Sequence, residues 1–227
     1  MAELFTSNEY FALLLTLGTF GIGFTLQKRY QSPVFNPILV GAVLSGGFLV
    51  LNGISVETYR SGCAPLQYLL TPATICYAIG LYEQIAALRK QLWAILMGVA
   101  AGVVASMGSI LLLCRVFGLE RVLELSLLPK SITTAIGMEL SQEAGGIAAV
   151  TTAAIILTGI LGNMIGPMLC RLLRIEEPIA QGVAFGTASH AIGTSRAIKI
   201  SQLTGAASSI ALTLAGLITV VLYSFLV

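Results

Sequence analysis

The chain has 227 residues, of which 56% are hydrophobic and 10% are charged, and its net charge is +2. Its mean hydropathy is +0.93, whereas soluble domains typically have about 25% charged residues. A soluble α-helical protein of this length would need far more polar surface. The composition therefore indicates an integral membrane protein. No basic cluster interleaved with aromatic residues is present, which argues against a nucleic-acid binder.

The charged residues are clustered, and this leaves six long uncharged windows along the chain. A helix needs about 20 apolar residues to cross a bilayer, so each window is a candidate span. The windows cover residues 10–27, 30–56, 61–82, 91–114, 144–170 and 200–227. The sequence predicts an all-α polytopic membrane protein with one integral membrane domain over residues 1–227. We expect about six full transmembrane helices and two short re-entrant or broken-helix segments.

The basic residues predict the orientation of the chain. Lys28 and Arg29 end the first window, and Arg89 and Lys90 precede the fourth. By the positive-inside rule, both loops are cytoplasmic and the N-terminus lies outside. The N-terminus has no basic n-region, so the first window is expected to be a retained span and not a cleaved signal. We expect a multi-pass protein of the bacterial cell (inner) membrane.

Two segments are too short and too polar to cross the membrane as simple helices. They are residues 127–143, with Lys130 near the start, and residues 178–199. The predicted orientation of the flanking spans requires the first segment to enter and leave on one side. Short polar segments of this kind indicate a transporter binding site. Half-helix N-termini at that depth favour an anion.

The second short segment contains the most unusual stretch of the chain, Gly186 to Ala197. It holds the only histidine, His190, together with Arg196 and four hydroxyl side chains. Polar and ionisable groups at membrane depth are costly and must face protein or water. This stretch is therefore a candidate substrate site.

Several strings in the chain resemble the LrgB/CidB family of bacterial membrane proteins. The specific ones contain Lys130 and His190, and the resemblance covers nearly the whole chain. The strings are Asn36-Pro37-Ile38-Leu39-Val40, Leu81-Tyr82-Glu83-Gln84, Leu128-Pro129-Lys130-Ser131-Ile132-Thr133-Thr134, Gly145-Gly146-Ile147, Gly159-Ile160-Leu161-Gly162 and Gly186 to Ala197.

The resemblance implies two functions. Family members were first named as antiholin-like regulators of murein hydrolase export and autolysis, acting beside a small holin-like membrane protein of the LrgA/CidA type. Relatives are linked to pyruvate uptake, and a plastid relative moves glycolate and glycerate. We therefore expect a transporter component for small carboxylates with a holin-like partner subunit. The alternative is an antiholin-like regulator that transports nothing itself. A homo-oligomer is compatible with either function.

The candidate substrate-binding residues lie in the two short segments, and each has a structural alternative. Lys130 either binds a carboxylate as a point charge or reaches the headgroups as an anchor. Arg196 offers a fork that matches a carboxylate or marks the cytoplasmic side. His190 either couples proton movement to transport or makes a structural hydrogen bond, and we expect proton symport or exchange over sodium coupling. The full set is Lys130, Ser131, Thr133, Thr134, Thr187, Ser189, His190, Thr194 and Arg196.

Two further residues are candidates for gating. Asn36 precedes a proline at the start of the second window, where proline needs no functional reason. Glu83 either gates or pairs with Arg89. The pairs Gly98-x3-Gly102 and Gly162-x3-Gly166 are interpreted as helix-packing sites.

No enzymatic function is expected, because the chain has no G-x-S-x-G or H-E-x-x-H motif. We also expect no cofactor and no metal site. The four cysteines show no C-x-x-C spacing, and they are interpreted as small buried hydrophobic residues.

Overall fold

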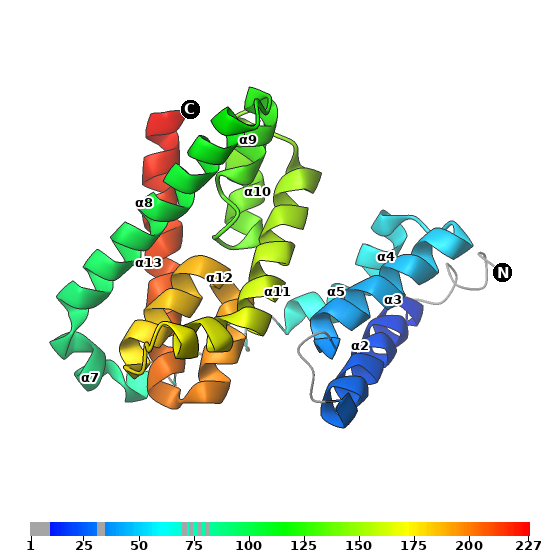
Figure 1. Cartoon of the computed structure of the whole chain (residues 1–227). Helices are drawn as coiled ribbons and strands as arrows, with labels where there is room; N and C mark the ends of the chain where they lie inside the picture. The colour runs from blue at the N-terminus through cyan, green and yellow to red at the C-terminus, as the bar shows by residue number, and fades with distance from the viewer. Residues whose placement is uncertain (1–9, 31–34, 70–71, 73–74, 77–78, 80–81) are drawn as a thin grey trace. The chain divides into compact units, whose positions relative to one another are not determined.

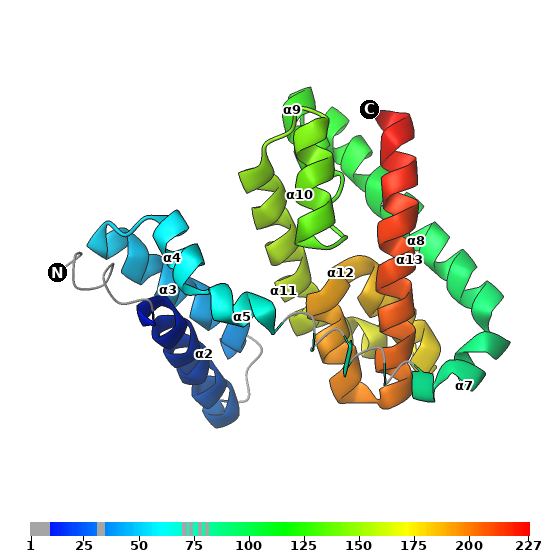
Figure 2. The ribbon, with the colours of Figure 1, turned by 180° about the vertical axis from the view of Figure 1, so that it is seen from behind.

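A computed structural model describes residues 10–30, 35–69, 72, 75–76, 79 and 82–227. All secondary structure in these residues is helical. The chain divides into two compact units, Met1–Cys76 and Tyr77–Val227, which are described separately (Figures 1 and 2).

The first unit pairs two apolar helices. α2 (Phe11–Tyr30) carries Lys28 and Arg29 in its last turn, and α3 (Pro37–Asn52) packs along it. Close approach occurs at Gly23, where a Cβ atom would lie 2.8 Å from the Cα of Pro37. Two short helices follow, α4 (Val56–Gly62) and α5 (Ala64–Tyr68).

The described part of the second unit contains three long continuous helices, three short helices and one long helix that is broken in the middle. The long helices are α8 (Leu92–Val116), α11 (Ala148–Leu172) and α13 (Gln202–Leu226). The others are α7 (Ile85–Lys90), α9 (Arg121–Leu127), α10 (Thr134–Glu143) and α12 (Pro178–Ile200). The core lies where α8 and α13 pack together, around Ile95, Val99, Ala207 and Ala211.

Four of the helices are long and apolar enough to cross a membrane, namely α2, α8, α11 and α13. They correspond to the first, fourth, fifth and sixth predicted windows. The second window yields α3, an apolar helix of 16 residues. The third window, 61–82, lies partly outside the described residues. The described residues therefore form an all-helical structure, as predicted, with four candidate membrane spans, and the predicted count of six spans is not confirmed.

The two short segments enter the second unit from opposite ends. Figures 1 and 2 show α9 and the end of α10 at the same end, with the turn between them pointing inward. Both ends of α12 lie at the opposite end, which also holds α7. Each segment therefore enters and leaves on one side, and the two approach each other in the interior.

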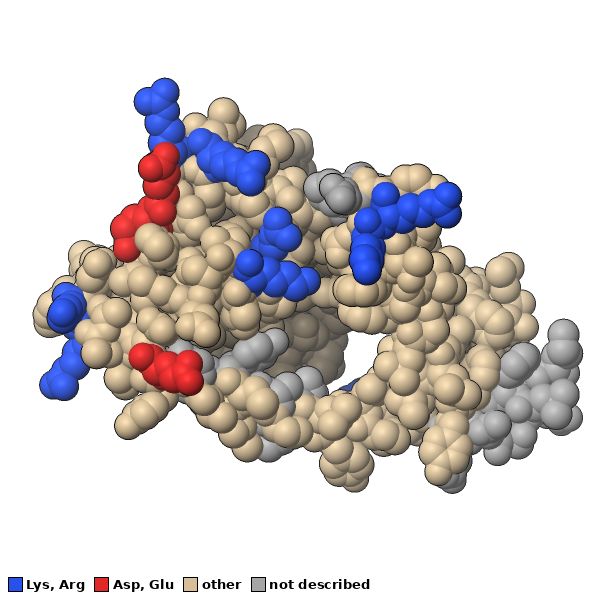
Figure 3. All heavy atoms as spheres, turned by 90° about the horizontal axis from the view of Figure 1, so that it is seen from below, with Lys and Arg blue, Asp and Glu red and all other residues tan. Residues whose placement is uncertain are grey.

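The basic residues gather at the end where α7 and α12 lie. They stand at the ends of helices, where they complement the helix dipole: Arg89 and Lys90 on α7, Arg171 on α11 and Lys199 on α12. Seen from below, this face of the unit carries more Lys and Arg than Asp and Glu (Figure 3). By the positive-inside rule this end is predicted to be cytoplasmic.

Candidate functional site

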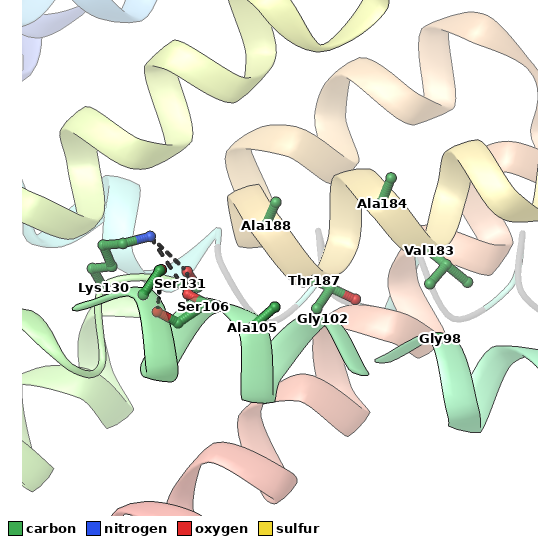
Figure 4. A pocket seen from close by; sticks show the side chains of 11 residues that line it. Gly98, Gly102, Ala105, Ser106, Lys130, Ser131, Val183, Ala184, Thr187 and Ala188 are labelled. Atoms are coloured by element: carbon green, nitrogen blue, oxygen red, sulfur yellow. Dashed lines mark hydrogen bonds between the residues drawn. The ribbon is translucent and has the colours of Figure 1, made fainter. Parts of the chain in front are cut away.

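A cavity of about 410 Å³ lies where the two short segments and α8 meet (Figure 4). Its walls are mostly small, with Gly98, Gly102 and Ala105 from α8 and Ala184 and Ala188 from α12. Its polar lining consists of Ser106, Ser109, Lys130, Ser131 and Thr187. The cavity therefore brings together three of the predicted site residues: Lys130, Ser131 and Thr187.

Lys130 is held by hydroxyl groups and not by an acid. Its Nζ atom lies 3.3 Å from the Oγ of Ser131 and 3.5 Å from the Oγ of Ser106. The two serine oxygens are 2.9 Å apart. Within the described residues the only ion pair joins Arg121 and Glu124. Lys130 is thus a partly buried cation at the edge of a cavity without an anionic partner in the described part of the chain.

The hydrogen atoms of this cluster can be counted. An ammonium group has three donors, and Lys130 uses two of them for the serines. Ser106 and Ser131 have one hydroxyl hydrogen each, and one of the two is used in the bond between them. One N–H and one O–H therefore stay available. Together they match the two oxygens of a carboxylate with charge-assisted bonds.

The position of Lys130 is fixed by its neighbours in the turn. α9 ends at Leu127, and the backbone N–H of Lys130 donates to the Leu127 carbonyl at 3.1 Å. Leu128 and Ile132 flank the turn, and each is only 1% exposed. Burial of these two side chains anchors the turn in the core and leaves the Lys130 side chain on the cavity side.

A buried hydroxyl network holds the α9–α10 segment against α11. Ser126 donates to the Val122 carbonyl at 2.6 Å and accepts from the backbone N–H of Ile147 at 2.7 Å. Thr151 donates to Ser141 at 2.7 Å. A Cβ atom at Gly146 would meet the Oγ atoms of Ser126 and Ser141. This contact explains the glycine in the Gly145-Gly146-Ile147 string.

Thr133 and Thr134 do not line the cavity. Thr133 is the N-cap residue of α10, although its side chain makes no capping hydrogen bond, and Thr134 is the first residue of that helix. The structure therefore places these two candidates at a helix start and not beside the Lys130 ammonium.

α12 is broken at two residues, Ser189 (φ −134°, ψ 16°) and His190 (φ 42°, ψ −139°). A Cβ atom on Gly193 would lie 2.6 Å from the carbonyl oxygen of Phe185. Eight residues of straight helix would separate these positions by about 12 Å. The two halves therefore fold back on each other. A positive φ is unusual for a residue other than glycine, so the break must be held by its surroundings.

The side chains at the break form those surroundings. The Nε2 atom of His190 lies 2.9 Å from the Ile155 carbonyl oxygen. Gly159 gives the ring its space, because a Cβ there would lie 2.7 Å from Nε2. Thr194 donates to the His190 carbonyl at 3.0 Å and bonds with the Ser208 hydroxyl at 2.9 Å. His190 and Thr194 therefore pack within the protein and are not among the residues that line the Lys130 cavity.

Three other candidates lie apart from Lys130. Ser189 lines a second cavity, described below. Arg196 is partly buried, and its Nε atom has no hydrogen-bond partner among the described residues. Neither residue lines the Lys130 cavity. Glu83 is exposed, and no ion pair between it and Arg89 is present in the described part of the chain.

Asn36 has a local structural role in the first unit. It is 3% exposed and caps α3, with its Oδ1 accepting from the backbone N–H of Ile38 at 2.9 Å. This bond satisfies one of the free N–H groups at the helix start.

The predicted helix-packing glycines make the expected close approaches. Gly98 and Gly102 of α8 face Val183 and Thr187, since a Cβ on either would lie 3.2 and 2.7 Å from those side chains. On α11, Gly162 faces Ser189 and Gly166 faces Phe185. The first half of α12 is thus held between two glycine faces.

The sequence reasoning did not identify Ser106 and Ser109. Both lie inside the fourth window, which was interpreted only as a span. A signal was present, because residues 98, 102, 105, 106 and 109 recur with helical periodicity and are all small. A small and partly polar stripe on an otherwise apolar helix indicates a face turned towards protein or water.

Comparisons with known proteins identify the family of this chain. The model of the LrgB-like family matches residues 16–227. The antiholin-like protein LrgB of Bacillus mycoides (strain KBAB4) is 35% identical over 217 residues, which cover 95% of this chain and 94% of that protein. Antiholin-like LrgB proteins of Bacillus cereus (strain B4264) and Bacillus anthracis (strain CDC 684 / NRRL 3495) match with the same identity and coverage. No solved structure matches. The chain therefore belongs to the LrgB-like family.

Proposed function

We propose that this protein is the carrier component of a transporter for small carboxylates such as pyruvate or glycolate, and that Lys130 binds the carboxylate. The observation that supports this is the ammonium of Lys130 beside a cavity, with two serine hydroxyls and no acid as partners among the residues that the structure describes. A charge at membrane depth without an anionic partner is costly. A bound carboxylate offsets that cost.

The two opposed short segments also support a carrier. In secondary transporters, discontinuous helices meet near the midplane at the substrate site. Here the α9–α10 turn and the first half of α12 line one cavity. A regulator of autolysis has no need of a partly buried lysine beside that cavity, whereas a carrier of anions does.

The second candidate function is the antiholin-like regulator, which the names of the relatives favour. In that case the partner is a small holin-like membrane protein, and the chain transports nothing itself. We propose such a partner for the carrier as well.

Uptake measurements distinguish these functions. The protein is reconstituted in proteoliposomes with and without the small holin-like subunit, and uptake of labelled pyruvate, glycolate or lactate is followed. We expect uptake in the wild type and a ten- to hundredfold loss of apparent affinity in Lys130→Ala, since a charge-assisted hydrogen bond contributes about 1.5–3 kcal/mol. The matched control is Lys199→Ala, an exposed lysine at the end of α12, which should behave as wild type. Absence of uptake in every preparation would contradict the carrier function and favour the antiholin-like regulator.

We also propose coupling to protons, or plain exchange, in preference to sodium. His190 is the only histidine, and its ring bonds the Ile155 carbonyl at the α12 break. Protonation would therefore act on the break and not directly on the substrate. Uptake should rise as the external pH falls. His190→Gln keeps a hydrogen-bond donor and loses the titratable group, so the response should flatten. A strict need for a sodium gradient would contradict this.

A further inference from the structure

A second cavity, of about 200 Å³, lies between α11 and the first half of α12. It begins at Gly162 and Ser189, next to the break in α12, and extends to Leu173 and Ile175 in the turn that follows α11. That turn lies at the end of the unit where the basic residues gather (Figure 1). The second cavity therefore leads from the interior towards the predicted cytoplasmic face.

The two cavities share part of their walls. Ala184 and Ala188 line both the Lys130 cavity and the second one. Both alanines are exposed, whereas the three residues between them, Phe185 to Thr187, are buried. Figure 4 shows Val183 and Thr187 pointing towards Gly98 and Gly102 of α8, and the two alanines pointing away from α8. Where the cavities adjoin, the side chains of this half-helix are therefore no larger than a methyl group.

The second cavity is mostly apolar but has a polar group at its inner end. Ser189 is 3% exposed, and its Oγ lies against Gly162, since a Cβ there would meet that oxygen. The Lys130 cluster and Ser189 thus mark two polar points, with the alanines between them. Passage requires binding that is favourable enough for a solute to enter and weak enough for it to leave, and one polar cluster followed by mostly apolar walls is compatible with both.

From this arrangement we infer that the two cavities are consecutive parts of one substrate route, which passes the Ala184–Ala188 ridge from Lys130 to the turn after α11. The inference rests on the proposed carrier function. It adds that the first half of α12 is the wall that the carboxylate passes, and that the width of the second cavity controls passage without contributing to binding.

Thiol labelling tests the route. The four cysteines are replaced by serine or alanine, and Ala184→Cys and Ala188→Cys are made singly in that background. The matched control is Leu161→Cys, which is 53% exposed on α11 and does not line either cavity. We expect a negatively charged methanethiosulfonate to label both alanine positions and to block uptake. Saturating pyruvate should slow the labelling several-fold, and Leu161→Cys, which lies outside both cavities, should show no such protection.

A second variant separates passage from binding. Leu169→Trp narrows the second cavity and lies outside the Lys130 cavity, so it should reduce uptake at least tenfold while a pyruvate-induced shift of the melting temperature is retained. If neither alanine position reacts with the reagent, or if both react without protection by pyruvate, the route is wrong. Such a result does not contradict the proposed binding site, provided that Lys130→Ala still weakens the pyruvate-induced shift of the melting temperature. Loss of that dependence on Lys130 would instead contradict the proposed function itself.

Discussion

The α9–α10 turn and the break in α12 look alike in sequence and differ in structure. Both are short, polar interruptions between apolar helices. In the first, apolar Leu128 and Ile132 are buried and the polar side chain of Lys130 lines a cavity. In the second, the polar side chains turn inward, and His190 and Thr194 bond backbone carbonyls. A polar segment at membrane depth can thus serve a ligand or satisfy its own backbone, and the pattern alone does not distinguish the two.

The largest effect on stability should come from filling the space beside His190. In Gly159→Ala the new Cβ would lie 2.7 Å from the imidazole, and overpacking of this kind costs about 1–3 kcal/mol. We expect a lower melting temperature in detergent. Gly108→Ala on α8, where nothing lies within 4 Å of the new atom, should not be destabilised. Lys130→Ala should keep the wild-type melting temperature, and a large drop there would make Lys130 structural as well.

A substitution at Ser106 tests the α9–α10 turn, where Lys130 is proposed to bind the ligand. Ser106→Ala removes one partner of the Lys130 ammonium and one of the two hydroxyls in the cluster. We expect about a tenfold rise in the KM for uptake with little change in the maximal rate. Ser109→Ala is the matched control, because Ser109 lines the same cavity but bonds the Ser106 carbonyl within its own helix. Equal effects of the two variants would remove Ser106 from the site.

A substitution at Arg196 tests whether the α12 segment also contacts the substrate. It does not line the Lys130 cavity, so Arg196→Ala should raise the KM less than Lys130→Ala does, by under about tenfold. Uptake kinetics of both variants in the same vesicles provide the measurement. A loss as large as that of Lys130→Ala, without rescue by Arg196→Lys, would instead place the guanidinium fork at the substrate.

The smallest effect should come from Thr187. Its Oγ1 is buried without a hydrogen-bond partner among the described residues, and an unpaired buried hydroxyl costs about 1–3 kcal/mol. Thr187→Val has the same shape and should raise the melting temperature slightly. Thr194→Val removes bonds to His190 and Ser208 and should lower it. A destabilised Thr187→Val would show that its hydroxyl is bonded after all, for example by water.

Much of the architecture follows from where charges are absent. The windows around α8 and α11 are bounded by Lys90, Arg115, Glu143 and Arg171, and the window around α13 begins after Lys199. The predicted orientation requires the segment between α8 and α11 to return to its own side. The direction of the His190 ring did not follow, because it depends on the space left by Gly159, 31 residues earlier in the sequence. The stripe of small residues marks the face of α8 on which Ser106 lies, but its pairing with Lys130 and Ser131 did not follow, because these partners come from a different segment.

The glycine faces on either side of α12 have a mechanical consequence. Helices usually lock together because ridges of side chains sit in the grooves of a neighbour. Gly98 and Gly102 on one side, and Gly162 and Gly166 on the other, present almost no ridge to the half-helix between them. The ridges come from α12 instead, because Thr187, Ser189 and Phe185 occupy the space that Gly102, Gly162 and Gly166 leave open. Three side chains of one half-helix therefore fit into notches on two neighbours, which fixes its register against both of them at once.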